Sequence, residues 1–335
     1  MMVSRVLSLL VISIMLLEST SCAQDARLSP TPQSASTLES KPRKTYADMI
    51  VGFAQLGAES EWRVANTKSI QETAVQLGVE LRFSDAQQSQ QKQIEAVRKL
   101  IMQKVDVIGI SPIVETGWEE VFQEAKAAGI PIIMVDRRAD VPEDLYMTIL
   151  GSDFLEEGQK AGRVMMELTN GKANIVELVG TLGSAPANGR YKGFRESLAR
   201  YPEMRIIDSV SGDFTRARGK EVMKTFLYKH GNSITAVFAH NDDMAVGAID
   251  AIKEYGLKPG VEIKIVSVDA AKGAFKAMIE GELNATIECN PLLGPQFFEL
   301  ALKVVNGEPV PKWVPSIEGI FYPNNAAEVL PTRKY

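Results

Sequence analysis

The sequence predicts an α/β fold in which two lobes, each built on a parallel sheet with helices on both faces, enclose a cleft. Apolar runs of about four to six residues alternate with segments of helical period along most of the chain, as in parallel sheets. About ten such runs occur, which fits two sheets of five or six strands better than one. The length of 335 residues is also too great for one compact α/β unit and suits two.

The first strand and the turn after it set the pattern for the rest of the chain. An apolar run at 50–55 leads into a turn and then into a helix. In such units, ligands bind at the carboxyl end of the strand, on the connection that enters the helix. Two acids, a serine, a tryptophan and an arginine lie on that connection: Glu59, Ser60, Glu61, Trp62 and Arg63. We therefore predict that this turn forms one wall of a ligand site.

The alternation of strands and helices then continues through both halves of the sequence. Gly129, Gly256 and Gly281 are expected to end three of the helices, since glycine adopts the left-handed conformation found there. A glycine-containing loop at 180–189 leads to Arg190, where the next helix is expected to begin. We expect strands at 50–55, 105–110, 132–135, 146–150, 174–179, 205–210, 236–239, 263–268, 285–288 and 317–321.

The N-terminal segment is predicted to direct export. Arg5 precedes an apolar run at 6–17 that is too short to span a bilayer comfortably, as in a secretory signal peptide. Ser19-Thr20-Ser21-Cys22 resembles a bacterial lipobox, whose cysteine is lipidated after cleavage, although leucine is usual where Ser19 stands. We expect a signal peptide at 1–21 and lipidation of Cys22, with export without lipidation as the alternative.

A flexible tether is expected at 22–44. The stretch is rich in Ser, Thr, Pro and Lys and has no periodicity, so it cannot bury enough apolar surface to offset its ordering entropy. The sequence thus predicts an exported protein, in the periplasm or at the cell surface, that a lipid anchor holds near the membrane.

Composition argues against several classes of partner and cofactor. The chain has 37 basic and 42 acidic residues and a formal charge of −5, so a nucleic-acid partner has no electrostatic basis. With only His230, His240 and two cysteines, we expect neither a metal site nor a cofactor. If Cys22 is lipidated, Cys289 has no disulfide partner and is most simply a packed thiol.

Polar side chains with planar hydrogen-bonding groups follow the strand ends in both halves. The set is Arg63, Asp136, Arg137, Arg190, Asn241, Asp269 and Glu288. Guanidinium, carboxylate and carboxamide groups match adjacent hydroxyls of a sugar ring, and Trp62 offers an apolar face for its C–H side. We therefore predict a site for a neutral polyol between the lobes.

Simpler explanations exist for individual residues. Charged residues at strand ends are often solvated or paired with each other, and Trp62 and Trp118 also fit core positions on amphipathic helices. His240 beside Asp242 could suggest a general base, but no nucleophile motif accompanies it. The Gly-Thr-Leu-Gly segment at 180–183 lacks the spacing of a phosphate-binding loop.

Several segments together resemble the periplasmic sugar-binding proteins of ABC importers, in the ribose/galactose-binding branch. The resemblance covers residues 45–322 in order. It rests on Glu-Ser-Glu-Trp-Arg at 59–63, Val-Asp-Arg at 135–137, Ser-Gly-Asp-Phe-Thr-Arg at 211–216 and His-Asn-Asp-Asp-Met at 240–244. It implies a type I periplasmic binding protein fold, with two Rossmann-like lobes joined by three crossings.

The resemblance also implies lobe boundaries and roles for residues. The crossings would lie near Leu150, Glu288 and Ser316, giving an N-terminal lobe of 45–150 plus 289–315 and a C-terminal lobe of 151–288 plus 316–335. Sugar contacts would come from Glu59, Ser60, Trp62, Arg63, Asp136 and Arg137 on the first lobe. On the other lobe they would come from Arg190, Asn241 and Asp269, with Glu288 at a crossing.

The function implied by the resemblance is capture of a monosaccharide, galactofuranose or a similar furanose, and its delivery to an ABC permease by a monomeric, non-enzymatic protein. A sensor that presents the sugar to a membrane kinase or chemoreceptor is the alternative. A LacI-type repressor would need a helix-turn-helix where the signal and tether lie. A glycoside hydrolase would need a carboxylate pair, which Asp136, Asp269 and Glu288 could in principle supply.

Overall fold

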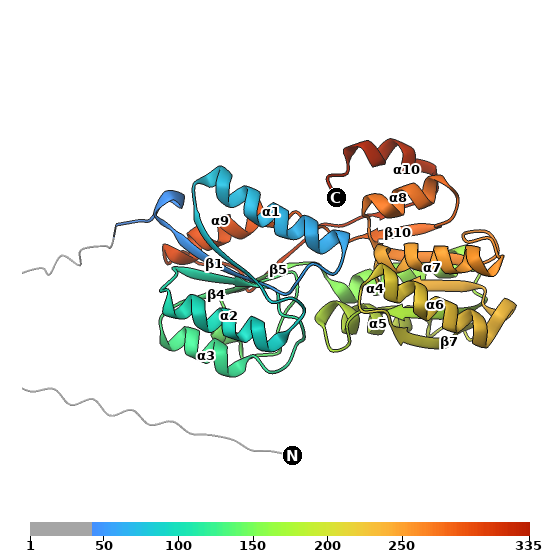
Figure 1. Cartoon of the computed structure of the whole chain (residues 1–335), viewed down its shortest axis with the longest axis horizontal. Coiled ribbons are helices and arrows are strands. Elements are labelled where there is room, and N and C mark those ends of the chain that lie inside the picture. Colours follow the sequence, from blue (N-terminus) through green and yellow to red (C-terminus); the bar gives the residue numbers. More distant parts are fainter. Residues whose placement is uncertain (1–41) are drawn as a thin grey trace, which may run out of the picture. The chain divides into compact units, whose positions relative to one another are not determined.

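Two six-stranded sheets organise the part of the chain that the structure describes (Figure 1). The computed structural model describes residues 42–335, and Arg43–Tyr335 form one compact unit. The first sheet has the order β11-β5-β4-β3-β1-β2, with β1 (Ile50–Gln55), β2 (Glu80–Asp85), β3 (Val107–Ile110), β4 (Ile132–Val135), β5 (Thr148–Gly151) and β11 (Trp313–Pro315). The second has the order β12-β10-β9-β8-β6-β7, with β6 (Ala173–Val179), β7 (Met204–Ser211), β8 (Ala236–Ala239), β9 (Lys264–Asp269), β10 (Ala285–Glu288) and β12 (Ile320–Phe321).

Helices cover both faces of each sheet, as the alternating pattern predicts. The first sheet is covered by α1 (Glu61–Leu77), α2 (Gln90–Met102), α3 (Glu119–Ala127) and α9 (Gly294–Val305). The second is covered by α4 (Phe154–Thr169), α5 (Ala185–Leu198), α6 (Arg216–His230), α7 (Asp242–Tyr255), α8 (Lys272–Ile279) and α10 (Pro323–Val329). Short 3-10 helices lie at Tyr46–Asp48, Glu143–Leu145, Gly231–Ser233 and Leu330–Thr332. The predicted two-lobed α/β fold is confirmed.

The apolar runs form strands because both faces of each sheet are buried. In β1, the alternation of side chains sends Phe53 to one face, where it packs with Ile70 of α1 and Phe297 of α9. Ala54 points to the other face, into a cluster with Trp118 and residues of α2 and α3. Continuous burial explains why these strands read as uninterrupted apolar runs in the sequence.

The chain passes between the two sheets three times. It leaves the first sheet after β5 at Gly151, returns after β10 at Glu288, and leaves again after β11 at Pro315 to form β12. The segments 152–153, 289–293 and 316–319 therefore connect the lobes.

The structure differs from the sequence prediction in five places. One is strand β11, where no strand was predicted. Strand β2 was not predicted, because its half-buried residues Glu80–Asp85 mix apolar and charged side chains. Strand β12 pairs antiparallel with β10, whereas we expected parallel sheets. Helix α10 was also not predicted. Helix α5 begins at Ala185 and not at Arg190, because the Ser184 side chain caps it and Pro186 stands in its first turn.

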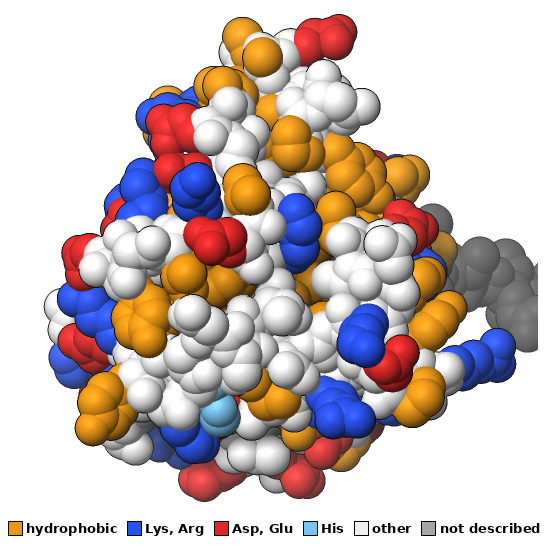
Figure 2. All heavy atoms as spheres, turned by 90° about the vertical axis from the view of Figure 1, so that its right-hand side faces the viewer, with side chains coloured by type: hydrophobic (Ala, Val, Ile, Leu, Met, Phe, Trp, Pro, Cys, Tyr) orange, Lys and Arg blue, Asp and Glu red, His pale blue; other side chains and the backbone are white. Residues whose placement is uncertain are grey.

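The surface and the N-terminal region add two further facts. Basic and acidic side chains are interspersed on the face of the C-terminal lobe shown in Figure 2, with no large patch of one sign. Among residues 42–335, no helix has both the length and the apolar character needed to cross a membrane. The predictions for the signal peptide at 1–21, for Cys22 and for the tether up to residue 41 fall outside the described residues.

Helices α4 and α5 pack closely because glycines line their contact. A Cβ added at Gly158 of α4 would lie 2.4 Å from the backbone oxygen of Arg190 and 2.9 Å from its Cα. The missing side chain therefore lets α5 approach, which fixes the backbone that carries Arg190.

We expect Gly158→Ala to lower the free energy of unfolding by about 1–3 kcal/mol, because the new methyl group can be accommodated only if the helices separate. Chemical denaturation measures this. Gly273→Ala in α8 is the matched control, since its Cβ would meet only atoms at 3.5 and 3.7 Å. The control should be neutral or stabilising by up to about 1 kcal/mol. Equal stability of Gly158→Ala and the wild type would contradict the close packing described.

Candidate functional site

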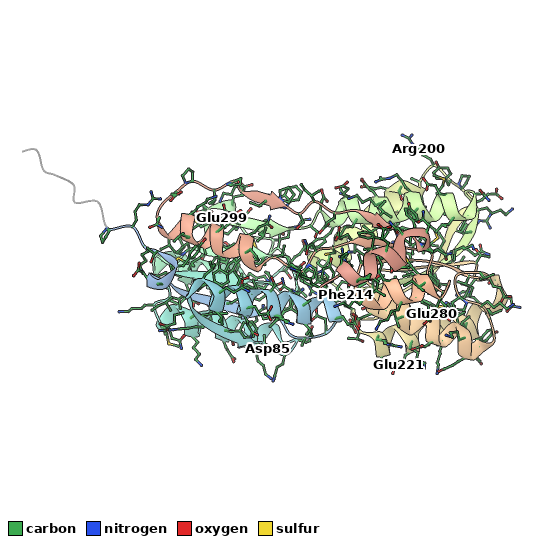
Figure 3. The ribbon with its side chains drawn as sticks, turned by 90° about the horizontal axis from the view of Figure 1, so that it is seen from above. Asp85, Arg200, Phe214, Glu221, Glu280 and Glu299 are labelled. Atoms are coloured by element: carbon green, nitrogen blue, oxygen red, sulfur yellow. The ribbon has the colours of Figure 1, made fainter. Side chains whose placement is uncertain are left out.

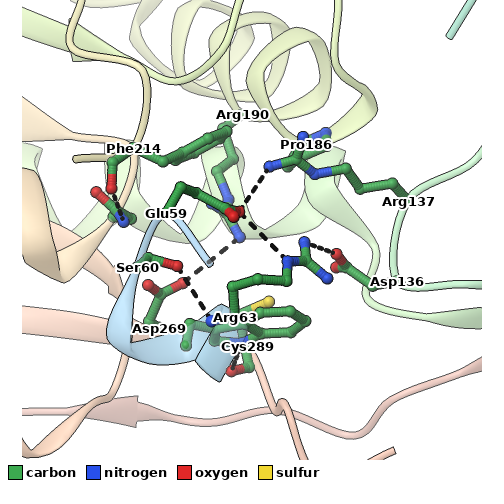
Figure 4. A pocket seen from close by; sticks show the side chains of 12 residues that line it. Glu59, Ser60, Arg63, Asp136, Arg137, Pro186, Arg190, Phe214, Asp269 and Cys289 are labelled. Atoms are coloured by element: carbon green, nitrogen blue, oxygen red, sulfur yellow. Dashed lines mark hydrogen bonds and ion pairs between the residues drawn. The ribbon is translucent and has the colours of Figure 1, made fainter. Parts of the chain in front are cut away.

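A pocket with about 280 Å³ of space free of protein atoms lies between the carboxyl ends of the two sheets (Figure 4). The structure places nine of the eleven predicted residues there, all except Glu61 and Glu288. The full lining is Glu59, Ser60, Trp62, Arg63, Asp136, Arg137, Pro186, Arg190, Phe214, Asn241, Asp269 and Cys289. Residues that follow β1, β4, β8 and β9 thus meet at one place, as parallel strands require.

On the N-terminal lobe, two arginines and two acids form a buried ion-paired group. Arg63 Nη2 lies 2.5 Å from Asp136 Oδ2, and Arg63 Nε lies 3.3 Å from Glu59 Oε1. Arg137 Nη2 also lies 3.3 Å from Glu59 Oε1. Burial alone would raise the pKa of Glu59, but the guanidinium groups of Arg63 and Arg137 outweigh it, and the pKa lies below its usual value. Glu59 is therefore held as a carboxylate.

Arg137 has hydrogen-bonding capacity that the described residues leave unused. Its Nη1 donates to the backbone oxygen of Ile113 at 3.1 Å, while its Nε is buried and has no partner among residues 42–335. Burial, together with repulsion from Arg63, lowers the pKa of Arg137 to about 10, so the side chain stays cationic at neutral pH. A buried donor without an acceptor is costly, so this atom is a candidate contact for a ligand oxygen.

On the C-terminal lobe, Arg190 occupies the corresponding position. Its Nε donates to Glu157 Oε2 at 2.7 Å and its Nη1 to the backbone oxygen of His240 at 2.6 Å. Its Nη2 lies 4.0 Å from Asp269 Oδ1. Burial raises the pKa of Asp269 well above its usual value, although Arg190 opposes the shift. Arg190 is thus held from behind and keeps part of its guanidinium facing the pocket.

Asn241 and Phe214 support each other at the same wall. The Asn241 side chain accepts from Met244 N at 3.0 Å, which caps α7, and donates to the backbone oxygen of Phe214 at 3.0 Å. The Phe214 ring lies 5.2 Å from the guanidinium carbon of Arg137 and 5.9 Å from that of Arg190. Figure 3 shows Phe214 between the two lobes. The ring offers the pocket an apolar surface edged by cations.

Both pocket aspartates have unusual backbone conformations. The φ angle is 64° at Asp136 and 129° at Asp269, values that residues with side chains seldom adopt. Such strained residues cluster at functional sites because the surrounding structure holds them there. The strain aims both carboxylates at the space between the lobes.

Three hydrogen bonds join the lobes around the pocket, and a fourth joins α1 to one of the connecting segments. Trp62 Nε1 donates to the Cys289 backbone oxygen at 2.6 Å. Glu61 N donates to Asp243 Oδ2 at 2.9 Å on one rim. On another rim, Glu115 N donates to the Gly183 oxygen at 2.8 Å and Asn188 Nδ2 to Glu115 Oε2 at 2.5 Å. The lobes are therefore in contact around the pocket, which is the arrangement of a closed cleft.

The placement predicted for Glu61 is wrong. Glu61 is the first residue of α1, and its exposed side chain borders a separate groove on the outer side of the helix. Its neighbours Ser60, Trp62 and Arg63 line the pocket because successive helical residues point about 100° apart. Only its backbone contributes, through the bond to Asp243.

The placement predicted for Glu288 is wrong as well. Its Oε1 accepts from Arg333 Nη1 at 2.7 Å, and its Oε2 accepts from Gly319 N at 3.2 Å. The Glu288 side chain thus binds the C-terminal segment through Arg333 and does not line the pocket. The adjacent Cys289 lines the pocket instead, since consecutive residues of extended chain point to opposite sides.

Sequence reasoning missed Pro186, Phe214 and Cys289 as lining residues. Phe214 follows the end of β7, so the rule that found Asp136 and Asn241 could have found it. Its aromatic side chain carries no polar group, so a search for polar residues after the strands does not select it. Cys289 was interpreted only as a packed thiol; it is 2% exposed and also borders the pocket.

His240 has no geometry suited to a general base in this pocket. Its ring is fully buried, and Nε2 lies 3.2 Å from Glu177 Oε1, outside the pocket lining. Burial lowers the pKa of His240, although Glu177 opposes the shift. The ring is a structural member of the C-terminal lobe.

Comparisons with known proteins agree with this geometry. A family model described as a periplasmic binding protein domain matches residues 51–309. The galactofuranose-binding protein YtfQ of Escherichia coli is 44% identical over 293 residues, covering 86% of this chain and 92% of YtfQ. A crystal structure from Mycobacterium smegmatis in complex with β-D-fucofuranose has a TM-score of 0.83 and 49% identity, covering 86% of this chain and 95% of that one. The binding protein of the arabinose ABC transporter of Shewanella sp. ANA-3, bound to α- and β-L-arabinofuranose, has a TM-score of 0.83 and 45% identity, covering 85% and 95%.

We expect Arg63→Ala to lower the free energy of unfolding by about 3–5 kcal/mol, because it leaves the buried Asp136 without its ion-pair partner, while Glu59 keeps only Arg137. Arg98→Ala is the control, since Arg98 pairs with Glu124 at 2.6 Å but both side chains are exposed to solvent. That change should cost no more than about 1 kcal/mol. Urea denaturation of both variants checks the difference, and similar losses would contradict a buried ion-paired site.

Proposed function

Since the chain belongs to the periplasmic binding protein domain family, we propose that it captures a monosaccharide between its lobes and delivers it to an ABC importer. Export to the periplasm follows from the family. For the role of each residue and the identity of the sugar, we propose assignments that rest on the charge, the hydrogen-bonding groups and the size of the pocket.

The charge of the pocket supports a neutral ligand. The pocket is lined by three arginines and three acids: Arg63, Arg137, Arg190, Glu59, Asp136 and Asp269. Each of these arginines already lies within 4.0 Å of an acid, so an ionic ligand would bring an unpaired charge into a buried site. A polyol brings none, and each of its hydroxyls both donates and accepts.

The unpartnered Nε of Arg137 is the observation that carries the proposal. It is a buried donor that lines the space between the lobes and has no acceptor among the described residues. A sugar hydroxyl or ring oxygen would satisfy it. Trp62 and Phe214 would cover the apolar faces of the ring.

The size of the pocket supports a single sugar ring. The 280 Å³ free of protein atoms, which include space open to solvent, lie below the about 300–1,000 Å³ of typical small-molecule sites and set an upper bound on the size of the ligand. The three similar proteins named above carry galactofuranose, fucofuranose and arabinofuranose in their descriptions. We therefore propose galactofuranose or a similar furanose as the ligand.

We propose that binding closes the two lobes about the three connecting segments. The lobes would comprise 45–150 plus 289–315 and 151–288 plus 316–335, and closure would be driven by contacts that the sugar makes to both at once. The alternative, a sensor that presents the sugar to a membrane kinase or chemoreceptor, has less support, because one of the similar proteins is named as part of an ABC transporter.

The remaining proposals concern assembly and location. We propose that the chain acts as a monomer, performs no catalysis and docks on the transmembrane subunits of a permease. We propose also that lipid on Cys22 anchors it to the membrane, with the following segment as a tether.

Thermal unfolding against a panel of pentoses and hexoses, including samples enriched in furanose forms, tests the ligand class. A sugar at about 100 times its dissociation constant should stabilise the fold by about 2.7 kcal/mol, which gives a clear rise in Tm. We expect a rise with one or a few furanose-forming sugars. No rise with any of them would contradict a sugar ligand and leave the fold unaffected.

Arg137→Ala should weaken sugar binding by about 2–4 kcal/mol, because it removes a charged donor from a desolvated site. Isothermal titration calorimetry measures the change. Arg138→Ala is the matched control: the neighbouring side chain is 52% exposed, lies 3.5 Å from Glu115 and does not line the pocket. Equal affinities of the two variants would mean that the sugar binds elsewhere.

A further inference from the structure

The three segments that connect the lobes meet at the carboxyl group of Glu318. Glu318 belongs to the third connection, and its Oε1 accepts from Ser152 Oγ of the first at 2.5 Å and from Asn290 N of the second at 2.9 Å. On the same network, Ser152 Oγ lies 3.4 Å from Cys289 Sγ. One carboxyl group thus joins all three connections.

Glu157 of α4 lies beside this junction with one oxygen unused. Its Oε2 accepts from Arg190, which lines the pocket, but its Oε1 is buried and has no partner among the described residues. Ligand atoms of Glu157, Cys289 and Glu318 all lie within 4.8 Å of one another. The unpartnered oxygen thus belongs to a side chain that is 1% exposed and lies next to a second carboxyl group.

Counting hydrogens shows which group can supply the missing donor. The hydroxyl hydrogen of Ser152 is used on Glu318. The thiol of Cys289 lies near both Ser152 Oγ and Glu157, and its single hydrogen can serve only one of them. Because a thiol is a weak donor, a proton on Glu318 is the stronger donor in this cluster for Glu157 Oε1.

The charges around the junction require such a proton. Arg190 is already shared by Glu157 and Asp269, and Lys160 Nζ donates to the backbone oxygen of Glu318 and not to its carboxyl group. Within residues 42–335, no lysine or arginine forms an ion pair with the Glu318 carboxyl group. If both acids were ionised, two carboxylates would face each other in a poorly solvated place.

We propose that Glu318 is a positioning residue, whose protonated carboxyl group donates to Glu157 Oε1 and thereby links the three connections to the pocket arginine Arg190. This proposal deepens the proposed function and rests on it for the role of Arg190 in binding. The link runs from Ser152 and Asn290 through Glu318 and Glu157 to the guanidinium group. Glu318 itself does not line the pocket.

The direction of the pKa shift agrees with this arrangement. Burial, and then the neighbouring carboxylate of Glu157, raise the pKa of Glu318 to about 8, while Arg190 opposes the shift. Burial also raises the pKa of Glu157 and of Cys289, although Arg190 again opposes both shifts. Because the pKa is raised in the folded state, the stabilisation is fully present below the ordinary glutamate pKa and is lost as the pH rises to about 8.

Glu318→Gln tests the proposal, because the amide keeps an acceptor for Ser152 and Asn290 and a permanent donor for Glu157. Tm is measured without ligand from pH 5.5 to 9 for the wild type and the variant. Asp242 and Asp243 also have raised pKa values, about 7 and about 6, and they affect both proteins. The quantity compared is therefore the difference in Tm between the wild type and the variant at each pH. The Tm of the wild type should fall by several degrees relative to the variant up to about pH 8 and then stay level. A constant difference would overturn the proposal.

Glu328→Gln is the matched control, an exposed glutamate of α10 for which the difference curve should be flat. Glutamate labelled with ¹³C at the side-chain carboxyl gives a measurement on the wild type itself, in case Glu318→Gln does not fold. One carboxyl resonance should titrate near pH 8, and its absence would overturn the proposal. A divalent cation retained through purification, with a wild-type Tm that falls on addition of EDTA, would also overturn it, because the cation would then occupy the place of the proton.

A binding measurement separates a positioning role from a merely structural one. From pH 7 to pH 9 the affinity of the wild type for its furanose should fall several-fold more than that of Glu318→Gln, since Asp269, whose pKa is also raised, affects both proteins alike. If both proteins respond alike to pH, Glu318 does not act on Arg190 and the proposal fails. If no sugar binds to the wild type, the proposed function fails, while the Tm and resonance measurements still test the proton.

Discussion

Buried charges at the cleft are arranged so that each one has an opposite charge as a neighbour, and this pairing governs the rest of the site. Arg63 is held between Asp136 and Glu59, and Arg190 between Glu157 and Asp269. Because breaking such a pair leaves a desolvated charge, the side chains have little freedom to rearrange around a ligand. The walls of the pocket are therefore rigid, and selectivity comes from the positions of fixed donors and acceptors. The same pairing leaves no pocket arginine without an acid beside it, so the pocket favours a neutral polyol over an ion.

The pairing also extends beyond the pocket. Arg190 reaches the cleft only because Glu157 and the His240 backbone oxygen hold it from behind, and Glu157 lies beside the place where the three connections meet. The N-terminal side is anchored differently, through Glu59, which binds both of its arginines and also accepts from Gln88 Nε2 at 2.8 Å. The two sides of the pocket thus differ. The arginines of the N-terminal side are held by residues of their own lobe, whereas Arg190 is held by Glu157, which lies beside the segments that connect the lobes.

Sequence reasoning found the fold and most of the residues that line the pocket, because both follow from strand order. A residue just past a buried parallel strand lies at one edge of its sheet, so Asp136, Asn241 and Asp269 could be placed together without coordinates. Strand order does not predict the direction in which a side chain points at the start of a helix. Glu61 and Arg63 differ only in rotation about α1, and the sequence does not say where that helix begins relative to the pocket. Glu288 and Cys289 differ in the same way along an extended segment. Strand β2 was missed because it is half-exposed and mixes apolar with charged side chains, and helix α10 was missed because it is short and has only one buried residue.

The route of the chain between the sheets has a consequence for how the protein reaches this structure. Strands β11 and β12, which lie at the edges of the two sheets, both come from the segment after residue 312, although their partners β5 and β10 lie elsewhere in the sequence. The pairing of β11 with β5 joins residues more than 160 positions apart. Closing loops of that size is entropically costly and slows folding.

A growing polypeptide cannot complete either half until that last segment has been synthesised, so the nascent protein stays incompletely folded for nearly the whole of its translation. Premature termination in this region would leave both halves with an open sheet edge, a template for aggregation.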